Sequence, residues 1–249
     1  MHRDIIITNN HHVGFDMKAI PKIEKPRQCE AITPINSRLK RLSDCEYFNV
    51  KMQYPLMGFS HAVVECYVRE EVAERLIMAA KSLPSGLRLC ILDAWRPLSL
   101  QLELYDQYSR TVINKYGLEY KTDEEKTAVI SRFISYPSHN VLLPPVHTTG
   151  GAVDLTLIDR TGQELNMGTE FDCFSDMSRT DYYESVGLDE KIRDNRRILY
   201  NAMIDAGFTN LPSEWWHYDF GNSFWAYYNQ VPAIYKGIFS IGETDYEKE

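Results

Sequence analysis

Apolar side chains recur at helical spacing in residues 69–86. They are Val72, Leu76, Ile77 and Ala80. A spacing of three and four positions puts these side chains on one face of an α-helix. The pattern ends at Pro84 and Gly86, which are typical of residues that follow a helix. We therefore predict an amphipathic helix with one buried face in this segment.

Three further segments have the periodicity and the end signals of helices. They are residues 97–117, 122–135 and 188–207. The first begins at Pro97 and ends at Gly117, which suits the preference of proline for helix starts and of glycine for helix ends. In the second, Thr122 and Glu125 have the spacing of a capping box, and the third ends at Gly207.

Four shorter segments read as β-strands. They are residues 60–68, 87–93, 152–159 and 214–220. The first alternates and is rich in β-branched residues, and the second is a short apolar run after a turn. In the third, Asp154 shares a face with Ala152 and Thr156, opposite an apolar face. This alternation predicts a half-buried strand that carries an acidic side chain.

The remaining segments predict irregular structure. Residues 1–45 show no clean periodicity, and residues 135–151 contain three prolines and a glycine pair. No linker rich in Pro, Gly or Ser divides the chain. We therefore expect one α+β domain over residues 1–249, with a central antiparallel sheet and flanking helices.

Composition excludes several classes of protein. The 249-residue chain has a formal net charge of −8, which argues against nucleic acid as a partner because phosphate binding needs clustered Lys and Arg. No apolar stretch approaches the length of a membrane span. The first fifteen residues do not form a secretory signal, so a cytoplasmic location is expected. The five cysteines are widely spaced and form no C-x-x-C pair, so neither a disulfide framework nor a thiolate metal site is predicted.

Two segments carry candidate chemistry. In HTTGGAVDLTL, Gly150 and Gly151 allow a tight turn, so that His147 and Asp154 can point to one spot. In EWWHYDF, a carboxylate and a histidine flank two tryptophans. Two histidines and an aspartate are a sound ligand set for catalytic zinc, and Glu214 would then accept a proton from a water. Residues i and i+3 of a regular strand face opposite ways, so we place Glu214 in the turn before the strand that carries His217.

Simpler interpretations compete with each of these roles. A histidine among aromatic side chains can be a hydrogen-bonded core residue, and Asp154 can pair with an arginine. Arg96, at the end of a buried strand, can form a structural ion pair or can present a fixed cation to an oxyanion. Asp172 can pair with a nearby arginine such as Arg179 or can bind a cationic ligand. From the residues alone the metal site and the simpler interpretation are equally favoured.

Four motifs together resemble those of the D-alanyl-D-alanine dipeptidase family of zinc peptidases, which includes the vancomycin-resistance D,D-dipeptidases. In chain order they are DAWRP at 93–97, HTTGGAVD at 147–154, MGTEFD at 167–172 and EWWH at 214–217. The likeness covers the chain from about Ala62 to Phe220. The doubled tryptophan favours dipeptidases over the related D,D-carboxypeptidases and hedgehog-type domains, whose fold of a central antiparallel sheet with flanking helices is similar.

The resemblance implies a role for each matching residue. One Zn²⁺ per chain would be held by three ligands, His147, Asp154 and His217. Glu214 would be the general base and later the acid, and Arg96 would stabilise the tetrahedral intermediate. Asp172 would hold the free amino group of a small D-dipeptide substrate. Trp215 and Trp216 would brace the base and the ligand and would wall a small substrate pocket.

The resemblance also leaves alternatives and departures. A D,D-carboxypeptidase acting on peptidoglycan stem peptides is the enzymatic alternative, and an inactive metal-holding domain that binds a partner is the other. Glu214 and Arg96 argue against the inactive domain, which needs neither a base nor an oxyanion clamp. Pro145 stands where relatives often have Ser, and residues 1–45 and 222–249 are expected to be divergent extensions.

Overall fold

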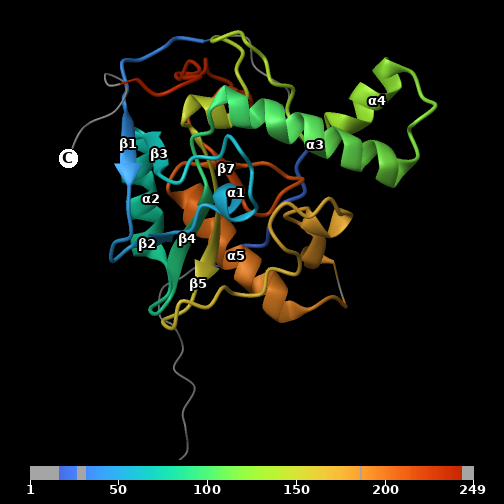
Figure 1. The fold of residues 1–249 in the computed structure, drawn as a ribbon. Coiled ribbons are helices and arrows are strands. Elements are labelled where there is room, and N and C mark those ends of the chain that lie inside the picture. The colour runs from blue at the N-terminus through green and yellow to red at the C-terminus, as the bar shows by residue number, and fades with distance from the viewer. Residues whose placement is uncertain (1–16, 27–31, 186, 243–249) are drawn as a thin grey trace, which may run out of the picture.

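The computed structural model describes residues 17–26, 32–185 and 187–242 of the chain. Its centre is a five-stranded sheet (Figure 1). In sheet order the strands are β2 (Phe48–Val50), β4 (Arg88–Asp93), β5 (Ala152–Ile158), β7 (His217–Asp219) and β6 (Thr209–Asn210). A separate antiparallel pair joins β1 (Leu39–Leu42) to β3 (Cys66–Arg69). The expected α+β architecture is confirmed.

Six α-helices surround the sheet in the described part of the chain. They are α1 (Gln53–Leu56), α2 (Glu70–Ser82), α3 (Leu98–Tyr116), α4 (Asp123–Ile130), α5 (Glu190–Asp205) and α6 (Ser223–Asn229). Figure 1 shows α3 and α4 together at one end of the molecule, away from α2 and α5. None of the helices in the described ranges is long and apolar enough to cross a membrane.

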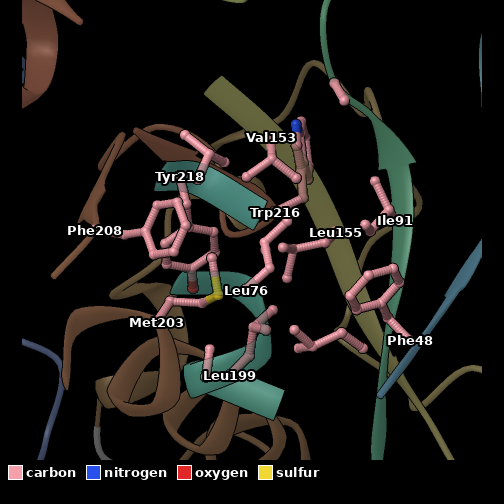
Figure 2. Close-up of a cluster of buried hydrophobic side chains, with 14 of the residues drawn as sticks. Phe48, Leu76, Ile91, Val153, Leu155, Leu199, Met203, Phe208, Trp216 and Tyr218 are labelled. Atoms are coloured by element: carbon pink, nitrogen blue, oxygen red, sulfur yellow. The ribbon is translucent and has the colours of Figure 1, made fainter. Parts of the chain in front are cut away.

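The main hydrophobic core lies between one face of the sheet and the helices α2 and α5. Val153 and Leu155 of β5 meet Leu76 of α2 and Met203 of α5 in this cluster, and all four side chains are buried (Figure 2). A second cluster lies along α3, where Leu104 and neighbouring side chains are buried. The alternation along β5 thus sends its odd-numbered residues into the core and leaves Asp154 on the opposite face.

The four predicted helices are present, but α4 ends at Ile130 and not near residue 135, and α1 and α6 were not predicted. Gly117 ends α3 with φ 62°, a left-handed conformation that suits glycine. Thr122 and Glu125 form the predicted capping box at the start of α4. The helix predicted in residues 69–86 buries Val72 and Leu76 on its apolar face, as its spacing requires.

Several strand predictions differ from the structure. Within residues 60–68 only the last part is regular strand, and within 214–220 only three residues are. Residues 1–45 were predicted to be irregular but contain β1. The sheet is not wholly antiparallel, because β2 pairs with β4 in parallel. The prediction that β5 is half-buried is wrong: every residue of it is buried, since Phe171 packs over the second face against the cluster of Cys90, Leu92 and Ile158.

Candidate active site

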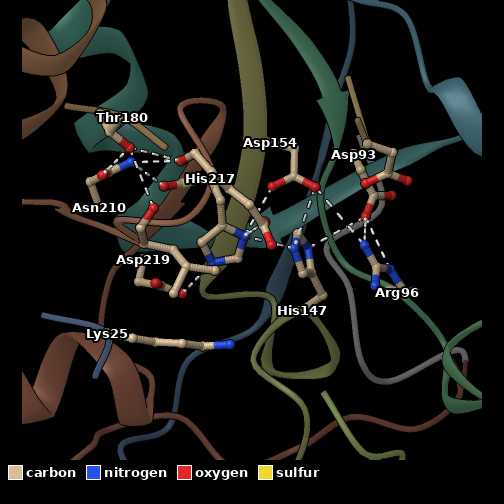
Figure 3. Close-up of polar contacts among 12 residues, drawn as sticks. Lys25, Asp93, Arg96, His147, Asp154, Thr180, Asn210, His217 and Asp219 are labelled. Carbon is tan, nitrogen blue, oxygen red and sulfur yellow. Dashed lines mark hydrogen bonds and ion pairs between the residues drawn. The ribbon is translucent and has the colours of Figure 1, made fainter. Parts of the chain in front are cut away.

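Three side chains converge at the centre of the sheet. Asp154 of β5 and His217 of β7 are directly paired across neighbouring antiparallel strands, with Asp154 Oδ1 3.0 Å from His217 Nδ1. His147 Nε2 lies 3.2 Å from His217 Nδ1 and 3.5 Å from Asp154 Oδ2. One ligand atom from each residue lies within 4.8 Å of the others, and all three residues are buried (Figure 3). The structure therefore brings together the three predicted metal ligands.

The glycine pair makes the short connection between two of these ligands possible. Gly150 has φ +73°, and a Cβ there would lie 2.5 Å from a methyl carbon of Leu39. A Cβ on Gly151 would lie 2.4 Å from the carbonyl oxygen of Phe220, which is backbone and cannot give way. Only glycine fits at both positions, so the chain can turn from His147 directly into β5.

Each histidine has a second polar partner that orients its ring. His147 Nδ1 donates to the carbonyl oxygen of Ala94 at 2.8 Å, and His217 Nε2 donates to Asp219 Oδ1 at 3.0 Å. The same Asp219 oxygen accepts a hydrogen bond from Asn222 Nδ2 at 2.6 Å. With these protons placed, the unprotonated nitrogens of His147 and His217 both face Asp154, as in metal sites whose histidines are held by outer hydrogen bonds.

The charges of the cluster suit a cation. Burial alone would raise the pKa of Asp154, but the imidazoles of His147 and His217 outweigh it and hold that pKa well below its ordinary value. Burial disfavours a charged His217, yet the carboxylates of Asp219 and Asp154 raise its pKa well above the usual value. The protein around His217 thus favours a positive charge at this point, which a proton or a metal ion can supply.

Glu214 lies in the turn before β7, as predicted. Its Oε2 is 4.0 Å from His217 Nδ1, which puts the carboxylate at the edge of the cluster. The backbone of Glu214 is fixed because its carbonyl oxygen accepts hydrogen bonds from Thr180 Oγ1 at 3.2 Å and Asn210 Nδ2 at 3.1 Å. Burial raises the pKa of Glu214 to about 7, so near neutral pH this carboxyl can both accept and release a proton.

Arg96 follows β4 and lines a cavity that the two histidines, Asp154 and Glu214 also line. Its Nη2 donates to Asp93 Oδ2 at 2.8 Å, and its Nη1 donates to Gln101 Oε1 at 2.7 Å. Nη2 also contacts the Tyr54 hydroxyl at 3.3 Å and lies 3.9 Å from Asp154 Oδ2. The structural ion pair and the cavity-facing cation, considered as alternatives from the sequence, occur together here.

Asp172 lines the same cavity and has a strained backbone with φ 57°. The hydroxyls of Tyr54 and Tyr108 both donate to its Oδ2, at 2.8 Å and 2.7 Å. Burial raises its pKa to about 6. The suggested partner Arg179 instead pairs with Asp181 at 3.0 Å, so the structure does not support a structural ion pair for Asp172 with that arginine.

Comparison with known proteins identifies the family. The model of a family described as D-ala-D-ala dipeptidase matches residues 59–236. The chain belongs to the D-alanyl-D-alanine dipeptidase family. The match extends beyond Phe220, where the resemblance was expected to end, and so includes α6. Membership makes this protein an enzyme of a metallopeptidase family, and the expected family is confirmed.

Three relatives named D-alanyl-D-alanine dipeptidase illustrate the likeness. The relative from Synechocystis sp. is 32% identical, over 94% of this chain and 100% of its own. The Escherichia coli K12 relative is 32% identical over 54% of this chain and 56% of its own, and that of Enterococcus faecium is 30% identical over 59% and 70%. A solved vancomycin-resistance D,D-pentapeptidase in complex with Zn(II) aligns at a TM-score of 0.38 and 14% identity, covering 68% of this chain and 82% of its own.

The two tryptophans of this dipeptidase-family chain lie behind the site. Trp215 and Trp216 are buried with their rings 5.4 Å apart, and Trp215 Nε1 donates to Thr169 Oγ1 at 2.8 Å. The Trp216 ring lies 5.6 Å from that of Phe171, next to Asp172 in sequence. Neither indole lines the cavity that holds the histidines, where a pocket wall was expected, but Trp216 lines a neighbouring cavity that Glu214 and Asp172 also line. We therefore place Trp215 as a support and Trp216 as both a support and a wall of that second cavity.

Some site residues of this family member were missed in the sequence. Tyr54 and Tyr108 lie outside every motif, and no local pattern marks them. Asp219 could have been predicted as a partner of His217, because a residue two positions later on a strand points to the same face. Asp93 stood in the DAWRP motif without a role, and the structure makes it the carboxylate that holds Arg96. Pro145, the expected departure from the family pattern, lines the cavity.

Proposed function

We propose that this protein hydrolyses D-alanyl-D-alanine, or a closely related D-dipeptide, to free amino acids with one Zn²⁺ held by His147, Asp154 and His217. The observation that carries the proposal is the buried convergence of these side chains beside Glu214 in a chain of the dipeptidase family. A zinc ion bound there would acidify a water and polarise the peptide carbonyl.

The donor set fits such an ion. Outer hydrogen bonds occupy the far nitrogen of each histidine, so one lone pair of His147 and one of His217 face the Asp154 carboxylate. Two neutral imidazoles and one carboxylate are a common catalytic zinc set that leaves a position for water. The cluster also opens on a cavity lined by Arg96 and Glu214, so substrate can reach it.

Glu214 is proposed to move the proton. Its carboxylate accepts a proton from the attacking water and then gives it to the nitrogen of the departing amino acid. A group serves both steps best when its pKa lies near the working pH, and burial places that of Glu214 at about 7.

Arg96 and Asp172 are proposed to hold the developing oxyanion and the free ammonium of the reacting dipeptide. The Arg96 guanidinium, fixed by Asp93 and Gln101, faces the cavity and would stabilise the oxyanion of the tetrahedral intermediate. Asp172, fixed through Oδ2 by two tyrosine hydroxyls, keeps its other oxygen for the substrate ammonium. Arg96 and Asp172, both in the same domain, would thereby set the distance between the free amine and the scissile bond of the substrate.

An assay of D-Ala-D-Ala hydrolysis tests this function. The zinc-loaded protein is expected to release D-alanine from the dipeptide, to stop when a chelator removes the metal, and to recover when zinc is restored. L-Ala-L-Ala is the control of equal size and charge. Release that persists without metal, or no release from any D-dipeptide, would reject the proposal.

A further inference from the structure

A second cavity, of about 270 Å³, adjoins the site, and the mechanism above makes no use of it. Asp172 and Glu214 line both this cavity and the one that holds the histidines. Two aromatic side chains, Phe133 and Phe174, are also common to both linings. A ligand bound to Asp172 can therefore extend into the second cavity without leaving the site.

The second cavity is lined by three cationic side chains, Lys25, Arg132 and Arg179. Arg179 is paired with Asp181. Lys25 Nζ donates to the carbonyl oxygens of Ser131 at 2.8 Å and Arg132 at 3.1 Å, which leaves one of its three N–H groups for a ligand. Within the described ranges, no carboxylate lies within 4.0 Å of the cationic groups of Lys25 or Arg132.

The lining carries as many carboxyl groups as cationic side chains, so the positions of these charges, and not their sum, decide where an anion can bind. Apart from Asp172 and Glu214, which the reaction uses, Asp176 is the acidic side chain of the lining. The pKa of Lys25 is lowered, chiefly by desolvation; the charge of Glu214 raises it and that of Arg132 lowers it, so both charged groups lie within electrostatic reach of the ammonium. Lys25 and Arg132 thus present positive charge that no described carboxylate neutralises at contact distance.

Lys25 belongs to the segment 17–26, which precedes the part of the chain that matches the family. This segment is attached to the body of the protein. The buried Ile20 donates its backbone N–H to Glu184 at 3.1 Å, and Tyr228 donates to the carbonyl oxygen of Glu24 at 2.7 Å. These two contacts attach the segment to the body of the protein just before Lys25. Lys22 lies between them. Figure 3 draws Lys25 with the polar residues of the site.

We propose that this basic cavity is a specificity subsite for an acidic side chain on the first residue of the substrate dipeptide. The inference rests on the proposed function, in which Asp172 binds the free ammonium. That contact places the first α-carbon at the wall shared by the two cavities. The side chain of that residue then enters the second cavity, where its carboxylate meets Lys25 and Arg132.

Binding can be measured apart from turnover with the zinc-loaded Glu214→Gln protein. The probes are D-Glu-D-Ala and D-Gln-D-Ala, which have the same shape and differ in one charge. Calorimetry is expected to show about fivefold tighter binding of D-Glu-D-Ala, the scale of a partly exposed ion pair, and to lose the difference at high salt.

Variants locate the charge that is responsible. Adding Lys25→Gln or Arg132→Gln is expected to reduce the preference for D-Glu-D-Ala, and the two together are expected to abolish it. Lys22→Gln removes the same charge from the same segment at a position that is exposed, as Lys25 is, but lies outside the lining, so it should leave the preference unchanged.

Equal binding of the two dipeptides, binding of neither, or a preference that survives both substitutions would overturn the subsite. The proposed function fails separately, on the D-Ala-D-Ala assay with wild-type protein. A charge preference in binding without any D-dipeptide hydrolysis would keep the subsite and reject the proposed function. Hydrolysis of D-Ala-D-Ala without the charge preference would keep the function and reject the subsite.

Discussion

Asp154 and His217 are 63 positions apart in sequence and are directly opposite each other on β5 and β7, with Asp154 Oδ1 3.0 Å from His217 Nδ1. Directly opposed residues of an antiparallel pair project to the same face. The register of these two central strands therefore decides that the carboxylate and the imidazole meet. A shift of one residue would turn one of them into the hydrophobic core.

Loss of one ligand should remove the metal. We expect purified protein to carry about one zinc per chain and His217→Ala to lose it, because two remaining ligands hold zinc poorly. Metal content by mass spectrometry checks this. His139→Ala removes an exposed histidine that lies outside the cluster and serves as the control. Full zinc occupancy in His217→Ala would contradict the ligand assignment.

Glu214→Gln tests the general base. The substitution keeps the shape of the side chain but cannot accept a proton, so zinc content should stay normal while kcat falls about 10²-fold or more. Steady-state hydrolysis of D-Ala-D-Ala, with metal analysis of the same sample, provides the measurement. Near-normal turnover would assign proton transfer to another group.

Arg96→Lys tests the oxyanion clamp. Lysine keeps the charge but cannot bond Asp93 and Gln101 together as the guanidinium does, so kcat should fall about 10²-fold with a smaller change in KM. Arg110→Lys, in an exposed pair with Asp106, is the matched control. A change in KM alone would make Arg96 a residue that binds the ground state.

Asp172 should make the enzyme depend on a free substrate amine. Acetylation removes the positive charge and adds bulk, so N-acetyl-D-Ala-D-Ala should not be cleaved, and Asp172→Ala should weaken dipeptide hydrolysis severely while zinc stays bound. A pentapeptide ending in D-Ala-D-Ala should be refused for the same reason. Efficient cleavage of the blocked dipeptide or the pentapeptide would move the protein to the carboxypeptidase alternative.

The raised pKa of Asp172 should also affect stability. Burial raises this pKa from 3.8 to about 6, so between these values the folded protein binds more protons than the unfolded chain, and its stability falls as pH rises. Asp172→Asn removes this penalty and can still accept the tyrosine hydrogen bonds. In metal-free protein it should raise the free energy of unfolding by about 1–3 kcal/mol at pH 8.

Urea denaturation at several pH values measures this effect. The gain from Asp172→Asn should shrink as pH falls through about 6 towards 4, because the wild-type carboxyl is then protonated in the folded state. A gain that is constant with pH would attribute it to packing and not to charge. Loss of dipeptide binding in the more stable variant would show that the buried carboxylate is kept for function.

The sequence alone predicted four of the six described helices and named the three residues that the structure brings together as a candidate metal cluster. Helix signals are local: the spacing of Val72 and Leu76, the cap at Thr122 and the glycine at position 117 act within a few residues of each helix. The ligand types at His147, Asp154 and His217 and the turn position of Glu214 were likewise readable, because they depend on residue chemistry and on two short segments.

Tertiary structure alone decided the extents of the strands and the surroundings of the site. A strand ends where its partner ends, so β1 had no sufficient local signal, and residues 214–220 did not show that β7 would span only His217–Asp219. Tyr54, Tyr108 and Lys25 reach the site from segments far apart in the chain. No local sequence pattern indicates which groups their hydroxyls and ammonium will contact. Such roles arise only when packing brings distant segments together, because hydrogen bonds and ion pairs depend on distance in space and not on separation in sequence.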